Sequence, residues 1–425
     1  MVVSPRHQDV RRAISTSLVS HAEVAPTQGR LECIHPAILY RLLSVRGMLR
    51  ELPRAVWRRL PGVANLTMRK GVWPRGAVHS PTSNTDMNEI FRDTSSHQHG
   101  TNWRAWVRAH LRRNGTWVTL RRVQREGWRK ALHRWRLWLQ ILDTPPILTE
   151  RVDGRTPVEV RLLCCERDYL CGIWALKSFY HFAAVRYPLV IHLQGKVPKR
   201  AVARLQTHFP RARVVPQAEA DRFVEAWLAE RNFLRLLAAR RYSCMMLKLI
   251  DFSVMSHSQN LLTLDTDILF FRSPTELLIA THEPLHVSLF QHDGASTYNL
   301  SEERARSELG IDLAPRINAG LRVFARESLD LSRCEAYLAH PDVARPSGWI
   351  EQTLHALYAS EQGKVAYLPD AYWISLEPNF HWDSLIARHY AGPSRPLLTS
   401  EGIPRLIQTG FLEQLRGPEQ RFIRS

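Results

Sequence analysis

Asp265 and Asp267 stand one residue apart, with Thr266 between them, directly after the apolar run 261–264. If the chain bends where a strand ends, both carboxylates can turn toward one point. A hard divalent cation prefers oxygen ligands of this kind and takes phosphate oxygens of a substrate beside them. Such a cation offsets the charge of a diphosphate leaving group, which is Lewis-acid catalysis. The spacing therefore predicts a metal site that handles a phosphorylated substrate.

An Asp-x-Asp pair is a weak signal by itself, because polar loops contain many such pairs. Here a second apolar run, residues 268–271, follows the pair, so the carboxylates interrupt an otherwise apolar stretch. The alternative is a structural role, in which the two carboxylates cap a helix that begins near Ser273 and Pro274. The strand before the pair favours the metal site.

Strand-like and helix-like segments alternate from about residue 157 onward, and this order predicts an α/β fold with a mainly parallel sheet flanked by helices. The expected strands cover residues 158–164, 189–193, 212–215, 261–264, 286–290, 316–324 and 364–368. The expected helices cover residues 169–185, 218–255, 327–339 and 350–360. Ligands collect at the carboxyl ends of strands in open sheets, and Asp265 follows the fourth expected strand.

The positive charge of the chain is concentrated near its N-terminus. Residues 1–150 contain 25 Lys and Arg against 10 Asp and Glu, a net charge of +15, whereas the whole chain has +18. Residues 151–425 therefore contribute only +3. A nucleic-acid enzyme usually carries its basic surface on the working domain, so we do not expect a nucleic acid as partner.

The N-terminal third divides into two expected segments. Residues 1–100 mix Pro, Ser, His and Arg with one short apolar patch, and we expect a largely disordered basic extension. Residues 101–145 form an Arg/Trp-rich helical segment. Its tryptophans are Trp103, Trp106, Trp117, Trp128, Trp135 and Trp138. This helix either lies peripherally on an anionic membrane or packs its aromatic stripe against the following domain.

The sequence shows no targeting or membrane-spanning segment. The first thirty residues lack the apolar run of a secretory signal, and no window approaches 18 uncharged apolar residues. The six cysteines have no zinc-binding spacing, which favours a reducing compartment. We expect a cytoplasmic protein that can contact the inner face of a membrane.

From Arg241 to Pro274 the chain resembles the donor-site region of GT-A-fold glycosyltransferases, most of all the glycogenin-like and lipopolysaccharide galactosyltransferase-like enzymes. The resemblance continues over residues 158–410. It implies a GT-A domain over residues 155–415 that uses Mn²⁺ or Mg²⁺. It also implies transfer of a sugar from a nucleotide diphosphate sugar to a hydroxyl of a glycan or lipid-linked acceptor, as in cell-surface glycan or lipopolysaccharide synthesis.

The resemblance also implies roles for residues that would bind the donor. Asp168 and Tyr169 match the nucleoside-binding turn, where an aromatic ring packs on the base. Lys248 matches a basic contact to the donor, and Thr266 belongs to the same donor-binding group. Arg395 stands where the family usually has a lysine that contacts phosphate.

Further matches surround the sugar and the metal. Asn318 and Gly320 resemble the N-x-G strand that lines the sugar pocket, and Glu351 with Gln352 resembles the acid–glutamine pair near the anomeric carbon. Close relatives have Asp where this chain has Glu351. His389 belongs to a His-x-x-Gly sequence whose histidine is the third metal ligand.

Each match has an ordinary alternative. Lys248 could be a solvated helix residue, and Glu351 could be a first-turn acid that interacts with the helix dipole. Asn318 could bond backbone in a strand-end turn. Tyr169 could pack in the core, and His389 could be an unremarkable core or surface histidine.

Other function classes remain open at this stage. A nucleotidyltransferase can share the fold and the metal chemistry, and a GT-A-fold protein can bind without catalysis. A membrane- or nucleic-acid-binding protein could work through the basic N-terminal segment. A haloacid-dehalogenase phosphatase is disfavoured, because its Asp-x-Asp lies on the first strand and needs a later lysine and a second acidic pair.

Overall fold

The computed structural model describes residues 127–153, 156–282, 287–374 and 380–417. The chain divides into two units, Met1–Leu132 and His133–Ser425. The expectations for residues 1–100, and for most of the Arg/Trp-rich segment, lie outside the described residues.

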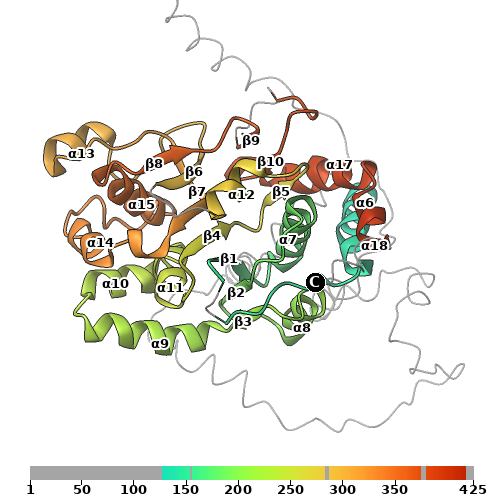
Figure 1. The fold of residues 1–425 in the computed structure, drawn as a ribbon, viewed down its shortest axis with the longest axis horizontal. Helices are drawn as coiled ribbons and strands as arrows, with labels where there is room; N and C mark the ends of the chain where they lie inside the picture. Colours follow the sequence, from blue (N-terminus) through green and yellow to red (C-terminus); the bar gives the residue numbers. More distant parts are fainter. Residues whose placement is uncertain (1–126, 154–155, 283–286, 375–379, 418–425) are drawn as a thin grey trace, which may run out of the picture. The chain divides into compact units, whose positions relative to one another are not determined.

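The second unit is built on a seven-stranded sheet with the strand order β3-β2-β1-β4-β7-β6-β8 (Figure 1). Its strands are β1 (Val158–Cys165), β2 (Leu189–Gln194), β3 (Arg213–Val215), β4 (Asn260–Leu264), β6 (Ser288–His292), β7 (Ile317–Ala325) and β8 (Val365–Tyr367). Only β7 runs antiparallel to both of its neighbours. The expected mainly parallel sheet is confirmed, and β1 and β4 lie at its centre.

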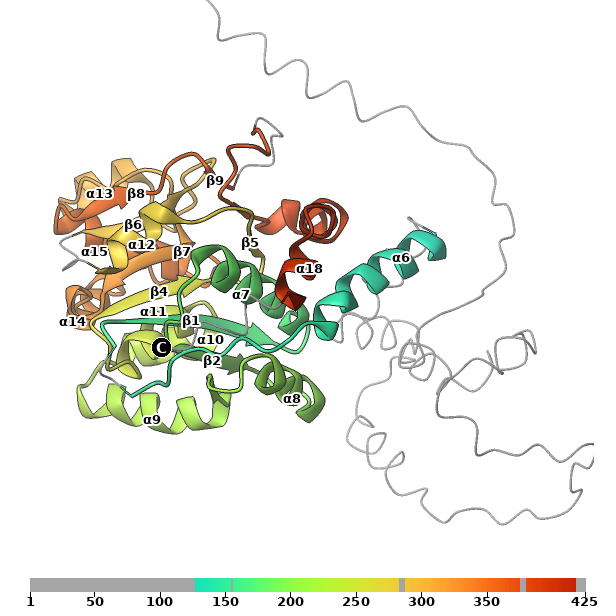
Figure 2. The ribbon, with the colours of Figure 1, turned by 45° about the vertical axis from the view of Figure 1, so that its right-hand side comes forward.

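Helices cover both faces of this sheet. The helices of the described residues are α6 (Trp128–Leu139), α7 (Tyr169–Ala183), α8 (Lys199–His208), α9 (Gln217–Glu230), α10 (Leu234–Tyr242), α11 (Met246–Val254), α12 (Thr275–His282), α13 (Glu302–Leu309), α14 (Leu331–Tyr337), α15 (Ile350–Glu361), α16 (Arg395–Leu397), α17 (Ile403–Gln408) and α18 (Phe411–Arg416). Short helical turns complete the set: η2 (Gln140–Asp143), η3 (Arg326–Ser328), η4 (Gly392–Ser394) and η5 (Leu398–Gly402). In both ribbon views α7 lies on one side of β1 and β2, and α9 lies on the other (Figures 1 and 2). None of the described helices is long and apolar enough to cross a bilayer.

The sheet separates two hydrophobic cores because successive strand side chains point to opposite faces. Leu262 and Leu264 of β4 belong to the core that includes α7, whereas Leu261 belongs to the core that includes α11 and α15. The strand before the carboxylate pair is therefore buried on both faces, as central parallel strands usually are. This burial fixes the position at which β4 ends.

The central helix α7 is apolar on nearly all sides, which explains its place between the sheet and the C-terminal helices. Gly172 lets it approach β1 closely: a Cβ at this position would lie 3.3 Å from Leu162. Trp174 donates a hydrogen bond to the carbonyl of Trp138 at 2.9 Å. The C-terminal end of α6 thus packs on the domain core.

The expected helical tract over residues 218–255 is divided by the structure into three helices, α9, α10 and α11. Asn232 ends the first of these with φ of 58°, a left-handed conformation that asparagine adopts more readily than most residues. The division turns α11 onto the sheet, where Lys248 can reach the end of β4.

A small second sheet has the order β5-β10-β9, formed by Ile268–Phe270, Ala387–His389 and Tyr372–Trp373. Strands β10 and β5 are antiparallel and place His389 opposite Ile268. The N–H of Tyr390 also bonds the carbonyl of Asp267 at 2.8 Å. This pairing brings a distant histidine next to the carboxylate pair.

Candidate functional site

Asp265, Asp267 and His389 converge on one point at the carboxyl end of β4. Each offers one ligand atom, and these atoms lie within 4.8 Å of one another. Nε2 of His389 is 3.3 Å from Oδ1 of Asp267 and 3.8 Å from Oδ2 of Asp265. The β5–β10 pairing creates this convergence across more than 120 residues of sequence.

The three side chains fit a small divalent cation by their chemistry. Carboxylates suit Mg²⁺ and Mn²⁺, and an imidazole nitrogen is a ligand that many transition metals accept. Asp267 and His389 are buried, while the side chain of Asp265 is 27% exposed and keeps the cluster open to solvent. Burial raises the pKa of Asp267, but His389 and Arg395 lower it more, so this carboxylate is ionised at neutral pH.

Gly320 of β7 holds the histidine ring in place by close contact. A Cβ at Gly320 would lie 2.3 Å from Cε1 and 2.9 Å from Nδ1 of His389. Within the described part of the chain Nδ1 has no hydrogen-bond partner, so packing rather than bonding orients this side of the ring. The carbonyl of Gly320 also accepts the N–H of Asp265 at 2.9 Å.

Lys248 is buried beneath the carboxylate pair and donates to both oxygens of Asp265, at 3.0 and 3.2 Å. Its Nζ also lies 3.8 Å from Oε2 of Glu351. Burial lowers the pKa of Lys248, but Asp265 and Glu351 raise it more, and the net shift is upward. Lys248 is therefore a fixed positive charge at the site, and the solvated-helix alternative is excluded.

Glu351 lies at the start of α15 and is more deeply buried than Asp265. It is 2% exposed and forms an ion pair with Arg322. Its Oε1 is also 3.7 Å from Nε2 of His355. Burial lowers the pKa of His355 well below its usual range, and Arg322 and Lys248 act in the same direction. A neutral His355 leaves Arg322 and Lys248 as the cations that balance Glu351.

Arg322 is a residue that the sequence analysis missed. It is fully buried in β7 and donates to the carbonyls of Ala319 and Lys248, each at 3.2 Å. A signal for it existed, since a lone arginine inside the apolar run 317–325 must find a buried partner.

Gln352 and Asn318 hold the backbone around the site. Gln352 accepts from the N–H of Ala319 at 3.2 Å, and donates to the carbonyl and hydroxyl oxygens of Thr297 at 3.0 and 2.8 Å. Asn318 donates to Asp293 at 2.9 Å and accepts from the N–H of Gly320 at 2.9 Å. Asp293, which follows β6, is a second residue that the sequence analysis missed.

Arg395 bridges two carboxylates from different elements. Its Nη1 lies 3.1 Å from Oδ2 of Asp267, and its Nη2 lies 2.9 Å from Oδ1 of Asp168 and 3.5 Å from the hydroxyl of Thr266. The turn at Gly392, with φ of 50°, connects it directly to β10. Arg395 therefore lies nearest Oδ2 of Asp267, whereas His389 lies nearest Oδ1.

Tyr169 stands apart from this cluster. Its hydroxyl accepts from Arg204 of α8 at 2.5 Å, and the guanidinium also lies 6.0 Å from the centre of the ring. No described contact joins Tyr169 to the carboxylate pair. Its neighbour Asp168 is the link between α7 and the cluster, through Arg395.

The helix-capping alternative for the carboxylate pair does not fit this geometry. Strand β5 separates Asp267 from α12, and the described partners of the two carboxylates are Lys248, His389 and Arg395. Both carboxylates face cationic groups or imidazole at the strand end, which is the arrangement expected of a site for charged ligands.

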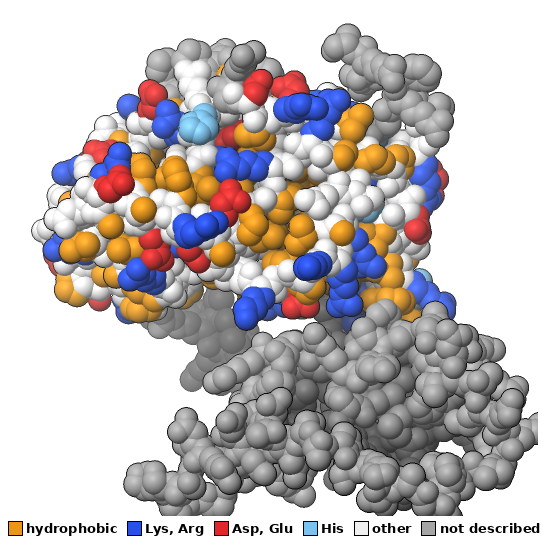
Figure 3. All heavy atoms as spheres, turned by 90° about the horizontal axis from the view of Figure 1, so that it is seen from below, with side chains coloured by type: hydrophobic (Ala, Val, Ile, Leu, Met, Phe, Trp, Pro, Cys, Tyr) orange, Lys and Arg blue, Asp and Glu red, His pale blue; other side chains and the backbone are white. Residues whose placement is uncertain are grey.

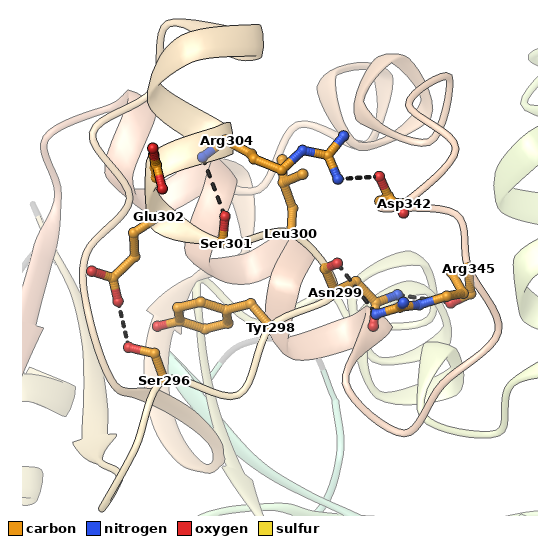
Figure 4. Close-up of a pocket in the computed structure, with 10 residues that line it drawn as sticks. Ser296, Tyr298, Asn299, Leu300, Ser301, Glu302, Arg304, Asp342 and Arg345 are labelled. Atoms are coloured by element: carbon orange, nitrogen blue, oxygen red, sulfur yellow. Dashed lines mark hydrogen bonds and ion pairs between the residues drawn. The ribbon is translucent and has the colours of Figure 1, made fainter.

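A polar surface hollow of about 670 Å³ lies on a neighbouring loop (Figure 4). Its lining consists of Ser296, Tyr298, Asn299, Leu300, Ser301, Glu302, Glu303, Arg304, Asp342 and Arg345. None of these residues belongs to the carboxylate cluster. Arg304 is committed to Glu308 and Asp342 at 2.5 Å each.

No protein-family model and no curated protein matches this chain. Among solved structures, the apo WbbM bifunctional glycosyltransferase is 15% identical, over 63% of this chain and 53% of that one, with a TM-score of 0.40. This chain thus spans about half the length of that protein. Mouse xyloside xylosyltransferase 1 is 14% identical, over 55% and 96%, with a TM-score of 0.34.

The galactosyltransferase LgtC, in complex with donor and acceptor sugar analogues, is 17% identical over 62% of this chain and 99% of that one, with a TM-score of 0.32. Each of these three structures is a glycosyltransferase, the class that the motifs of this chain resemble.

Proposed function

We propose that this protein is a metal-dependent glycosyltransferase that moves a sugar from a nucleotide diphosphate sugar to an acceptor hydroxyl. The observation that carries the proposal is the convergence of Asp265, Asp267 and His389 within 4.8 Å at the end of a central strand. Lys248 and Arg395 place two further cations beside this cluster. An anionic, metal-chelated diphosphate suits such a site.

Asp265, Asp267 and His389 would hold Mn²⁺ or Mg²⁺. When bound, the cation supplies Lewis-acid stabilisation of the diphosphate as its bond to the sugar breaks. Lys248 orients Asp265 and contributes a fixed positive charge that needs no reorganisation during the reaction. Arg395 can exchange Asp267 for a phosphate oxygen, since its guanidinium matches both anions in geometry.

The remaining residues act through the shape of the site. Asn318 and Gly320 form the strand against which the sugar would lie. Glu351 is buried with Arg322 and Lys248, so we propose that it positions Lys248 and does not exchange protons with substrate. Gln352 positions β7 through the N–H of Ala319. Asp168 holds Arg395 near the nucleotide.

Product analysis tests the proposal against a nucleotidyltransferase of the same fold. The full chain would be incubated with Mn²⁺, a panel of UDP- and GDP-sugars and simple hydroxyl acceptors. We expect release of the free nucleoside diphosphate, lost on metal chelation and in the variant Asp267→Asn. Release of pyrophosphate would assign nucleotidyl transfer, and turnover that survives both chelation and the variant would contradict the metal site.

A further inference from the structure

The charge of the second unit is unevenly distributed. Residues 169–218 contain eight Lys and Arg and no Asp or Glu, a net charge of +8. Because residues 151–425 sum to only +3, the rest of that range carries −5. The near-neutral total therefore conceals a strongly basic segment, which folds as α7, β2, α8 and β3.

Most of these cations lie on the surface around α8. We name as the α8 ridge the five exposed residues Lys196, Lys199, Arg200, Arg204 and Arg211. The opposite side of α8 is buried through Ala201, Leu205 and His208, so the helix can present its cations only to solvent. The view from below shows Lys and Arg side chains gathered over the α8 side of this face (Figure 3).

No described carboxylate lies within ion-pair distance of any α8 ridge residue, whereas exposed arginines elsewhere, such as Arg306 and Arg333, pair with acids. The positive charge of this segment also acts on a buried histidine of α8. Burial, together with the cations Lys177 and Arg204, lowers the pKa of His208 to about 4. The ridge thus keeps its positive charge available for an external anion.

We propose that the α8 ridge docks onto an anionic lipid surface. Such a surface attracts clustered Lys and Arg without requiring a shaped pocket. An apolar residue adjoins the ridge: Leu148 is 51% exposed, and the N–H of the preceding Ile147 bonds the carbonyl of His208 at the end of α8. Leu148 can therefore enter the headgroup layer beside the cations.

A single-stranded nucleic acid fits the ridge less well, because sequence-independent binding uses exposed aromatic rings as stacking platforms. Among the described residues, the large exposed aromatic side chains are Phe223, Tyr242, Trp349 and Tyr367, and all four lie outside residues 169–218. Tyr169, at one end of the ridge, has its hydroxyl held by Arg204. The α8 ridge offers positive charge, and Leu148 beside it offers an exposed aliphatic side chain. This combination suits a bilayer.

The ridge begins next to the carboxylate cluster. Arg204 contacts Tyr169, and the adjacent Asp168 contacts Arg395. A docked membrane would therefore lie beside the site, where an acceptor carried by a lipid could reach it. The ridge and its lipid partner do not depend on the chemistry proposed for the cluster.

Vesicle co-sedimentation tests the inference with the full chain. Vesicles of phosphatidylcholine with 30% phosphatidylserine would be compared with pure phosphatidylcholine, at about 0.1 M and about 1 M salt. We expect binding to the anionic vesicles only, lost at high salt because the Debye length falls from about 10 Å to about 3 Å. The triple variant Lys196→Gln, Lys199→Gln and Arg200→Gln should bind at least tenfold more weakly.

A matched control removes three exposed cations from other surfaces, with Arg222→Gln, Arg306→Gln and Lys364→Gln. It has the same net charge as the ridge variant and should retain binding. An equal loss of vesicle binding in both variants would show that binding depends on net charge and not on the ridge. Unchanged vesicle binding by the ridge variant would overturn the proposal. A ridge variant that loses single-stranded RNA binding but keeps vesicle binding would also overturn it. Unchanged Mn²⁺ binding by the ridge variant shows that the cluster is intact, so the two proposals fail separately.

Discussion

Gly320 leaves the space that the ring of His389, a proposed metal ligand, occupies. The ring of His389 occupies the space that a Cβ at Gly320 would need. We therefore expect Gly320→Ala to displace the imidazole and to weaken Mn²⁺ binding by about 10- to 100-fold, the range found when groups that support metal ligands are changed. Isothermal titration of Mn²⁺ into the full chain measures this.

Gly348→Ala is the matched control, because a Cβ at Gly348 would meet nothing within 4 Å. It should bind Mn²⁺ like the unmodified protein. If Gly320→Ala also binds normally, the ring of His389 is not a ligand and the site reduces to two carboxylates.

At the proposed metal site Arg395 would compete with the cation for Asp267, and this competition would give its substitution effects of opposite sign. Removing the guanidinium in Arg395→Gln frees Oδ2 of Asp267, so Mn²⁺ alone should bind more tightly, by a few-fold. The same change removes a positive charge beside the expected diphosphate, so UDP or GDP with Mn²⁺ should bind about tenfold more weakly.

Paired titrations, of the metal alone and of the nucleotide with saturating metal, separate these two effects. Arg395→Lys keeps the charge and should recover part of the nucleotide affinity. Weakening of both titrations to the same extent would mean that Arg395 only supports the fold, and that its exchange between Asp267 and phosphate does not occur.

At the scale of the elements, the strands of the seven-stranded sheet were predictable, and the pairing in the small second sheet was not. Strand β4 could be recognised because its apolar residues are followed at once by polar ones. Strands β5 and β10 have three residues each, and their pairing joins segments more than a hundred residues apart. Local sequence does not encode such a pairing, so His389 could be placed at the site only through family resemblance.

Arg322 is the residue that ties β7 to α11 and α15. Arg322→Met would leave the buried carboxylate of Glu351 with the neutral His355 and with Lys248, at 3.8 Å, as the one described cation beside it. Breaking a buried ion pair on one side costs about 3–5 kcal/mol, so we expect a loss of that size in the free energy of unfolding. Urea denaturation followed by tryptophan fluorescence measures it.

Two further variants make this result interpretable. Arg322→Met combined with Glu351→Gln removes the uncompensated charge and should recover part of the loss. Arg306→Met breaks an ion pair that is exposed on both sides and should leave the denaturation midpoint nearly unchanged. Equal effects of Arg322→Met and Arg306→Met would show that the buried network contributes little to stability.

For the molecule as a whole, the sequence predicted the architecture. It also singled out side chains that the structure brings together at the end of β4, but it did not predict the contacts that they make. Glu351 and Gln352 were expected beside the substrate, and the structure gives both of them protein partners. The charge pattern was likewise visible only as a total. The neutrality of residues 151–425 was correct as a sum, yet only folding shows that five of their cations gather on one exposed ridge.

The measurement that tests the central claim most directly is calorimetric titration of UDP and of GDP into the full chain, with and without Mn²⁺. We predict that one of them binds in the presence of Mn²⁺ and that chelation abolishes the binding. Asp267→Asn, which keeps the size of the side chain, should lose the metal-dependent binding while retaining the unfolding transition. Nucleotide binding that is equally tight without Mn²⁺, or unchanged in Asp267→Asn, would contradict a metal-dependent donor site at this cluster.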